Sequence, residues 1–302
     1  MKKIIIYGGK GWLGQYIEKW IREHGAALSG DGSVVSVVCS SVRVQPGAED
    51  LVRAELRAQK PDRVLCLIGR TRGPGCNTID YLEEPGRLQI NMRDNLLAPL
   101  LLAEVCREAG LHLTYMGTGC IFDSLAEGAP LAFGPNDNAN FHGSAYSTVK
   151  AGTDWCMRNI YSKTTLNVRI RMPVIGGIDH PFDFVSKICS YEKVINERNS
   201  ISVLPTLIGP LMSMMANKCV GTVSLCNPGP ITHGEVLQIY KEVVDPSFSW
   251  EYFTIEEQDK KLAAARSNCQ LDTRLMGQVY GVPDAATALR EYALPGRKPR
   301  RA

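Results

Sequence analysis

The sequence predicts an α/β fold with a doubly wound parallel sheet, and three observations carry this prediction. Short β-branched runs alternate with amphipathic stretches of a dozen or more residues through the first half of the chain. A glycine-rich turn, YGGKGWLG, joins the first of these runs to the first amphipathic stretch. Beyond about residue 172 the alternation becomes irregular and rich in proline. These features indicate a Rossmann-type sheet with a smaller α/β cap region.

Each element of the first half is predicted from its own pattern. Strands are expected where apolar, β-branched runs are short, at 2–7, 33–38, 62–69, 111–117 and 165–171. Helices are expected where apolar residues recur at helical spacing, at 12–24, 48–59, 86–109 and 144–161. We therefore expect a Rossmann domain over 1–172, with contributions from later segments, and a cap region mainly over 173–302, interleaved with the Rossmann core.

Composition excludes several classes of protein. The chain has 302 residues with 34 Lys and Arg against 31 Asp and Glu, so nothing favours nucleic acid or a membrane as partner. Its ten cysteines are scattered without a C-x-x-C pair, which is typical of a reduced cytoplasmic chain without a metal site. No run is long enough for a signal peptide or a transmembrane helix. The basic end PGRKPRRA, with Arg297, Lys298, Arg300 and Arg301, is expected to be solvated and frayed.

The glycines of the first turn have the spacing of a dinucleotide cradle. Gly8 would permit the tight turn, Gly11 would let a pyrophosphate approach the backbone, and Gly14 would let helix and strand pack closely. The helix that begins at Trp12 and Leu13 would offer its N-terminal N–H groups to the phosphates. The alternative is a tight turn with no ligand. Because the turn lies between a buried strand and a helix, we favour the cofactor site.

The end of the second expected strand bears on the choice of cofactor. NAD-binding folds usually place an acid there to hold the ribose hydroxyls. Here the sequence is VVCSSVR, and Ser40, Ser41 and Arg43 could receive a 2′-phosphate instead. The alternative is that Arg43 is simply solvated. We expect NADPH, with NADH as the second choice, and Gly69 after the third strand as a further cofactor contact.

A tyrosine and a lysine four residues apart are the candidate reducing pair. Tyr146 and Lys150 would share one helix face, and the lysine charge would favour the phenolate. Thr118 ends the strand LHLTYMGT, at the sheet edge where the cofactor is expected, and could hydrogen-bond the substrate oxygen. The alternative for the pair is a solvated helix face, because this spacing is common by chance.

The order glycine turn, Thr118, Tyr146-x-x-x-Lys150 resembles the extended short-chain dehydrogenase/reductase family. Longer strings narrow the resemblance to bifunctional UDP-4-keto-6-deoxyglucose 3,5-epimerase/4-reductases, namely TGCIF, FHGSAYSTVK, VRIRMP, FVSKICSYEKVIN, CNPGPITHGEVL, DPSFSWEYFTIEEQ and RSNCQLD. The resemblance covers nearly the whole chain. It implies an NADPH-dependent enzyme of UDP-rhamnose synthesis, with a nucleotide-sugar substrate and a substrate-binding cap region.

The resemblance also implies roles for further residues. Cys120 would be the base that takes protons from C3 and C5 of the keto sugar, and Lys187 the acid on the opposite face. His180 is the second choice for that acid, as related GDP-fucose synthases use a histidine. Asn95 would support the proton path of the reduction. The alternatives are a buried structural cysteine, a solvated lysine and a solvent-facing asparagine.

Substrate contacts come from the same resemblance. Arg171 and the pair Arg266 and Asn268 are candidates for holding the UDP phosphates or the sugar, because the planar fork of arginine suits phosphate. Asn196 is a weaker candidate. UDP and dTDP are not distinguished by these residues.

Two departures from the family pattern bear on its partners and its cofactor site. The loop CLIGRTRGPG replaces the usual small residues, and its Arg70 and Arg72 could contact cofactor phosphates or be exposed. No 4,6-dehydratase domain precedes this sequence, so we expect a separate dehydratase to supply the substrate. The family implies that a homodimer is an option. The rival functions are a reductase-only dTDP-4-dehydrorhamnose reductase, against which Cys120 argues, and a non-catalytic regulatory homologue, against which the intact Thr118, Tyr146 and Lys150 argue.

Overall fold

The computed structural model describes residues 1–28, 34–177 and 179–299, which group into two compact units. The first unit contains Met1–Thr118, Ser144–Arg169 and Leu211–Val223, and the second contains Gly119–Gly143, Ile170–Pro210 and the chain from Ser224 onward. Each unit is therefore assembled from segments that are far apart in the sequence. The boundary expected at residue 172 lies within a segment of the second unit, and 211–223 returns to the first.

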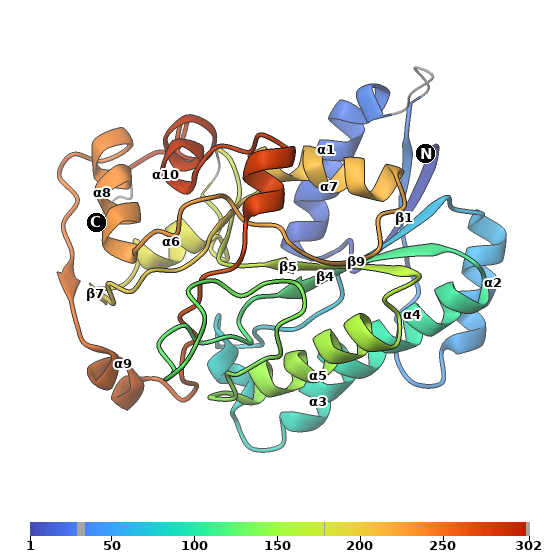
Figure 1. Ribbon diagram of the computed structural model, residues 1–302, viewed down its shortest axis with the longest axis horizontal. Helices are drawn as coiled ribbons and strands as arrows, with labels where there is room; N and C mark the ends of the chain where they lie inside the picture. Colours follow the sequence, from blue (N-terminus) through green and yellow to red (C-terminus); the bar gives the residue numbers. More distant parts are fainter. Residues whose placement is uncertain (29–33, 178, 300–302) are drawn as a thin grey trace. The chain divides into compact units, whose positions relative to one another are not determined.

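The first unit is built on a six-stranded sheet with strand order β2-β1-β3-β4-β5-β9 (Figure 1). Its strands are β1 Lys3–Tyr7, β2 Ser36–Cys39, β3 Arg63–Cys66, β4 His112–Thr118, β5 Thr165–Ile170 and β9 Gly221–Ser224. Strands β2, β1, β3 and β4 pair in parallel, as crossover connections require. Strand β2 lies on one side of β1 and β3 lies on the other, so the order of strand addition reverses between β1 and β3. Ligands bind such sheets at the carboxyl ends of the strands beside this switch point. The predicted doubly wound sheet is confirmed.

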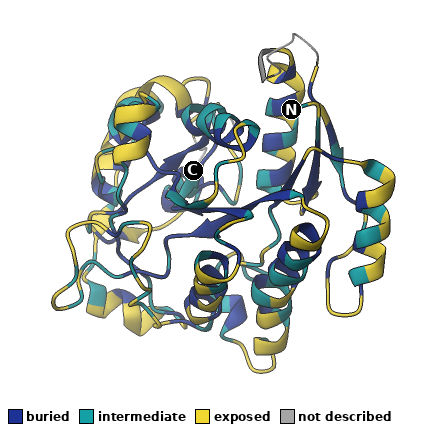
Figure 2. Cartoon of the chain, turned by 45° about the vertical axis from the view of Figure 1, so that its right-hand side comes forward, coloured by how far each residue is buried: buried dark blue, intermediate teal, exposed yellow. Residues whose placement is uncertain are grey.

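Helices cover both faces of this sheet. They are α1 Trp12–Leu28, α2 Glu49–Gln59, α3 Leu88–Met92, α4 Ala98–Glu108 and α5 Ala145–Asn159, with a single 3-10 turn η1 at Ile79–Leu82. Helix α1 lies on one face, and α4 and α5 lie on the other (Figure 1). The isoleucines of β1 are fully buried, as a central parallel strand requires. The strands of the sheet are coloured mainly as buried residues in Figure 2, whereas the helices carry both buried and exposed residues.

The second unit contains shorter strands in two-stranded sheets and has longer loops than the first. Its strands form two pairs, β6 Pro173–Val174 with β8 Ser202–Val203, and β7 Lys193–Val194 with β10 Glu251–Tyr252. Its helices are α6 Phe184–Ile188, α8 His233–Val243, α9 Ile255–Lys261 and α10 Ala285–Ala288, with a π-helical turn η3 at Leu275–Val279 and another, η4, at Leu289–Ala293. Helix α7 Leu204–Ala216 begins in this unit and ends in the first. Capping boxes at Thr232 and Thr254 begin α8 and α9. None of the helices that the structure describes has the length and apolar character to cross a bilayer.

The helix expected over 86–109 is interrupted. A π-helical segment, η2 Arg93–Leu97, separates α3 from α4. Pro99 explains part of this, because it has no N–H to donate to the carbonyl of Asn95 four residues earlier. The hydroxyl of Thr153 on α5 donates to that carbonyl instead, at 2.6 Å. Such segments often occur at functional sites, so this break marks Asn95 for attention.

The prediction for the basic C-terminal end is wrong at Arg297. This side chain is buried and forms an ion pair of 3.0 Å with Asp183, which is also fully buried. Its guanidinium also donates to the carbonyl oxygens of Ile175 at 2.7 Å and Ala293 at 3.1 Å. Lys298 beside it is exposed. The expectations for Arg300 and Arg301 lie outside the described residues.

Candidate functional site

The glycine turn of the first unit has the geometry that its spacing predicts. Gly8 has a φ of +85°, and a Cβ there would lie 2.7 Å from the main chain of Leu67. Gly14 is buried, and its Cβ would lie 2.6 Å from Gly9. Gly11 is exposed at the turn, where its N–H donates to the carbonyl of Gly8 at 3.0 Å. One glycine turns the chain, one leaves the backbone open, and one permits close packing.

Helix α1 begins directly after this turn, with Trp12 and Leu13 half-buried in its first turn. A helix of this length carries a positive dipole end and unpaired N–H groups at its N-terminus. The exposed backbone at Gly8 and Gly11 lies at the carboxyl end of β1, beside the switch point of the sheet. The residues present therefore fit a dinucleotide cofactor.

The end of β2 is arranged differently from the expectation. Ser40 is buried, and its hydroxyl donates to Glu55 of α2 at 2.6 Å while accepting from the N–H of Val42 at 3.1 Å. Its side chain is therefore used within the protein. Arg43 is exposed. Helix α2 brings the Glu55 carboxylate to this region, which the sequence of β2 alone did not reveal.

The loop after β3 is held by Asn95 from the π-helical segment. Asn95 is fully buried, accepts from the N–H of Arg70 at 2.8 Å and donates to its carbonyl at 2.8 Å. This excludes the solvent-facing alternative for Asn95. The Arg70 guanidinium pairs with Asp94 at 2.6 Å, and Arg72 is half-buried. Asn95 thus fixes the backbone beside Gly69, which is exposed.

Helix α5 carries the candidate reducing pair. Ser144 caps it by accepting from the N–H of Ser147 at 3.0 Å, so that Tyr146 lies in its first turn. Tyr146 and Lys150 are both buried, which excludes a solvated helix face. Lys150 donates to the hydroxyl of Tyr115 on β4, and its Nζ lies 4.8 Å from the centre of that ring.

Burial raises the pKa of Tyr115 well above its ordinary value, so its hydroxyl is neutral. The lysine therefore contacts a neutral phenol that no sequence pattern had singled out. Thr118 is the last residue of β4 and is buried, three residues after Tyr115 on the same strand. The structure thus brings Lys150 to the strand that carries Thr118.

In the second unit, Cys120 belongs to a polar cluster around Arg171. The Arg171 guanidinium donates to the Cys120 sulfur at 2.7 Å, to the side-chain oxygen of Asn199 at 2.6 Å and to the carbonyl of Ser267. Asn199 in turn donates to the side-chain oxygen of Asn268 at 3.0 Å. Cys120 is partly exposed, whereas Arg171, Asn199 and Asn268 are buried.

Helix α6 carries the candidate acid. Lys187 is half-buried on this short helix, which Asp183 caps by accepting from the N–H of Ser186 at 3.1 Å. His180, the second candidate, precedes the helix and accepts at Nδ1 from the N–H of Phe182 at 3.2 Å. In that arrangement only Nε2 of His180 would carry a proton to donate.

The remaining substrate candidates lie on loops of the second unit. Asn196 is exposed, and its side-chain oxygen lies 2.8 Å from the position of a Cβ on Gly234, near the start of α8. Arg266 is half-buried, and its guanidinium donates to the carbonyl of Ala264 at 2.5 Å. Asn268 is two residues further on and joins the Arg171 cluster through Asn199.

Four polar or small residues at these sites were not predicted from the sequence. A Cβ at Gly9 would lie only 2.4 Å from the Cys39 sulfur, and the signal for this glycine was the doublet GG. Asn91 accepts from Asn95 at 2.8 Å, and its signal was the four-residue spacing on a helix. Tyr115 and Asn199 had no local signal, because their partners are distant in sequence.

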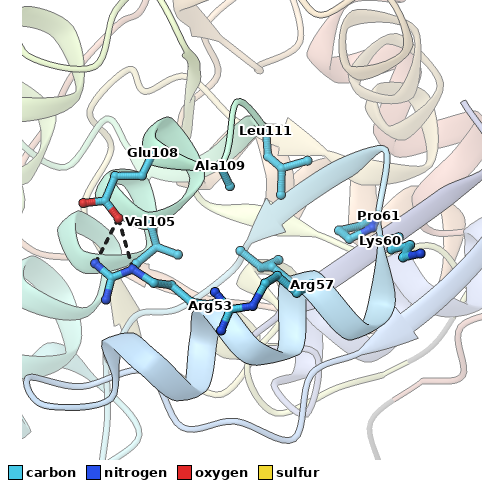
Figure 3. A pocket seen from close by; sticks show the side chains of 9 residues that line it. Arg53, Arg57, Lys60, Pro61, Val105, Glu108, Ala109 and Leu111 are labelled. Atoms are coloured by element: carbon cyan, nitrogen blue, oxygen red, sulfur yellow. Dashed lines mark hydrogen bonds and ion pairs between the residues drawn. The ribbon is translucent and has the colours of Figure 1, made fainter.

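A surface hollow of about 430 Å³ lies between the C-terminal parts of α2 and α4 (Figure 3). Arg53 and Glu108, which both line it, pair at 2.9 Å. Pro61 and Leu111 also line it, and they precede β3 and β4. The hollow therefore lies at the amino ends of these strands, opposite the edge where such sheets bind ligands.

The chain is similar to several known proteins over most of its length. The family described as NAD dependent epimerase/dehydratase matches residues 4–175. A crystal structure of a UDP-rhamnose synthase from Acanthamoeba polyphaga mimivirus is 39% identical, covers 96% of this chain and 97% of that chain, and superposes with a TM-score of 0.87.

Two plant proteins are also similar over most of the chain. A bifunctional dTDP-4-dehydrorhamnose 3,5-epimerase/dTDP-4-dehydrorhamnose reductase of Arabidopsis thaliana is 34% identical over 89% of this chain and 84% of its own length. A trifunctional UDP-glucose 4,6-dehydratase/UDP-4-keto-6-deoxy-D-glucose 3,5-epimerase/UDP-4-keto-L-rhamnose-reductase of the same plant is 35% identical over 89% of this chain and 38% of its own length. The chain therefore belongs to the NAD-dependent epimerase/dehydratase family and is an enzyme of its epimerase/reductase type.

Proposed function

We propose that the chain converts UDP-4-keto-6-deoxy-D-glucose to UDP-L-rhamnose, by epimerisation at C3 and C5 followed by reduction at C4. The observation that carries this proposal is the 39% identity with a UDP-rhamnose synthase over 96% of this chain and 97% of the other. Retention of both candidate residue sets supports it. Thr118, Tyr146 and Lys150 serve the reduction, and Cys120 and Lys187 serve the epimerisation.

The epimerisation needs a base on one face of the sugar and an acid on the other. The C4 ketone acidifies the protons on C3 and C5, since the electron pair released from either C–H bond passes to the ketone oxygen. Cys120 takes the proton as a thiolate, and the Lys187 ammonium returns one to the opposite face. Proton exchange with solvent resets the pair before the second carbon reacts.

The reduction uses the residues of the first unit. NADPH, when bound, would supply the hydride for the C4 ketone. Tyr146 donates the proton to the C4 oxygen, and Thr118 hydrogen-bonds that oxygen. The Lys150 ammonium favours the phenolate that Tyr146 becomes and holds the nicotinamide ribose. Asn95 supports the site by holding the backbone of Arg70 in place, at 2.8 Å in both directions.

The glycine turn and the end of β2 would hold the cofactor. Gly8, Gly11 and the start of α1 suit the pyrophosphate. The exposed Arg43 supports NADPH, since a guanidinium can pair with a 2′-phosphate and the residues that follow β2 contain no acid. Glu55, which reaches this region from α2, is the feature that favours NADH as the second choice.

The test supplies purified protein with UDP-4-keto-6-deoxyglucose and NADPH, and identifies the sugar product by NMR. We expect UDP-L-rhamnose from the wild type and none from Cys120→Ala or Lys187→Met. Cys219→Ala is the matched control, because this half-buried thiol belongs to the first unit and has no proposed role.

Three other outcomes of this experiment would contradict parts of the proposal. Reduction at C4 without inversion at C3 and C5 would favour the reductase-only alternative. No consumption of NADPH or NADH would favour the regulatory homologue. Rhamnose formation by Cys120→Ala at the wild-type rate would remove this residue from the mechanism. The dTDP sugar as a second substrate distinguishes the two nucleotides. A separate dehydratase and a homodimer remain predictions.

A further inference from the structure

Arg171 is a buried cation whose described partners include no carboxylate. Its guanidinium donates to the sulfur of Cys120, the side-chain oxygen of Asn199 and the main-chain carbonyl of Ser267. These partners are neutral unless Cys120 is ionised. A buried charge without a counter-charge is unfavourable in free energy. This environment therefore favours an anion at Cys120, which is the partner that can lose a proton.

The thiols of Cys226 and Cys269 also lie close enough to Arg171 to interact electrostatically with its charge. Burial raises the pKa of Cys226 to about 12 and also raises that of Cys269. Cys269 donates its proton to the carbonyl of Gly119 at 3.1 Å. Both are fully buried, whereas Cys120 accepts from Arg171 and is partly exposed. Cys120 is therefore the thiol at which a negative charge is both stabilised and reachable.

Among the described residues, the other titratable neighbours do not form an ion pair with Arg171. Burial lowers the pKa of His233 on α8 to about 4, with the charge of Arg171 as the second cause, so this imidazole is neutral at pH 7. Asp123 influences Cys269, and its carboxylate accepts from the N–H of Leu125 at 2.9 Å. Cys120 is thus the titratable group that the Arg171 guanidinium contacts directly among the described residues.

We propose that Arg171 is a positioning residue that holds Cys120 as a thiolate and so prepares it as the base of the epimerisation. This inference rests on the proposed function and names what activates its base. The Cys120 thiol loses its proton to solvent, and the thiolate then takes a proton from C3 or C5 while the C–H electron pair passes to the C4 oxygen. The role assigns Arg171 to the thiol in place of the contact with the UDP phosphates or the sugar that the family resemblance implies.

The test measures alkylation of the full chain by iodoacetamide from about pH 5 to about pH 10, without sugar or cofactor, because the thiolate is the reactive form. Peptide mass spectrometry reports the rate at Cys120 separately from other cysteines. Cys219 serves as an internal reference in the same sample. In the wild type at pH 7 we expect Cys120 to be alkylated at least about tenfold faster than Cys219. A rate at Cys120 equal to or below that at Cys219 would overturn the proposal without any variant.

Two substitutions then assign the effect to Arg171. Arg171→Met removes the charge at similar length and should slow alkylation of Cys120 at pH 7 by about tenfold, while Cys219 is unchanged. Arg171→Lys keeps the charge and should restore most of the rate. Equal rates at Cys120 in the wild type and Arg171→Met would refute the pairing.

A second readout separates this proposal from the proposed function. In deuterated water without NADPH, the wild type should exchange the C3 and C5 protons of UDP-4-keto-6-deoxyglucose, and Arg171→Met should lose about as much exchange as alkylation. Exchange unaffected by Arg171→Met would overturn the proposed role. Fast alkylation of Cys120 that depends on Arg171, with no proton exchange in the wild type, would contradict the proposed function and leave the role of Arg171 at Cys120 intact.

Discussion

Arg297→Met should destabilise the second unit by about 3 kcal/mol, because it leaves Asp183 buried without its cation. Both side chains are fully buried and pair at 3.0 Å. Removing one partner of such a pair typically costs about 3–5 kcal/mol. Asp183 keeps the N–H groups of Ile175 at 2.7 Å and Ser186 at 3.1 Å, which places the expected loss at the lower end of that range.

The assay is guanidinium chloride unfolding followed by circular dichroism, with the free energy of unfolding taken from the linear region. Lys298→Met is the matched control, because this neighbour is exposed and its loss should change the free energy by less than about 0.5 kcal/mol. The double variant Arg297→Met with Asp183→Asn should recover part of the loss, because asparagine carries no charge and its oxygen can still cap α6 through the N–H of Ser186. The N–H of Ile175 loses its acceptor in this variant, since the asparagine NH2 group only donates.

Two results would refute this reasoning. Equal stability of Arg297→Met and the wild type would mean that the C-terminal end is solvated in solution. A double variant no more stable than Arg297→Met would mean that lost packing, and not an uncompensated charge, causes the effect. Because Asp183 begins the helix that carries Lys187, Arg297→Met should also lower rhamnose formation.

Three further predictions concern the two units separately. Gly14→Ala should weaken NADPH binding at least about tenfold and destabilise the fold by about 1–3 kcal/mol, because the new Cβ would lie 2.6 Å from Gly9; a fluorescence titration equal to that of the wild type would contradict this. Asn95→Leu removes the two hydrogen bonds to the Arg70 backbone and should cost about 2 kcal/mol in stability together with a lower kcat; an unchanged kcat would leave Asn95 with a purely structural role. The pKa of His233 is lowered to about 4, so the unfolded chain binds its proton first as the pH falls below about 6.5. Stability should therefore fall by up to about 3 kcal/mol between pH 7 and pH 4 in the wild type, relative to a His233→Asn variant, in paired denaturant titrations; identical pH profiles would count against a neutral buried imidazole.

Local patterns predicted the parts of the fold that depend on neighbouring residues. The isoleucine run of β1, the amphipathic α1 and the glycine turn between them are each set by residues a few positions apart, and all three are observed. The break in the helix over 86–109 depends on the hydroxyl of Thr153, which lies 58 residues from the carbonyl that it satisfies. Arg297 looked solvated because its neighbours are basic, but its partner Asp183 is 114 residues away.

Arg171 shows the same limit at the candidate site. An arginine after a strand suits a phosphate contact and an ion pair equally well, and only its surroundings distinguish the two roles. Its partners Cys120, Asn199 and Ser267 are 51, 28 and 96 residues away.

For Arg171 to bind the substrate diphosphate, its guanidinium would have to break three hydrogen bonds and move out of its buried position. At about 1.5–3 kcal/mol for each bond to a charged group, the three bonds together cost about 5–9 kcal/mol before any phosphate contact forms. Stabilising Cys120 requires only that a proton leave the sulfur that Arg171 already contacts. The energetic comparison therefore favours the thiolate role.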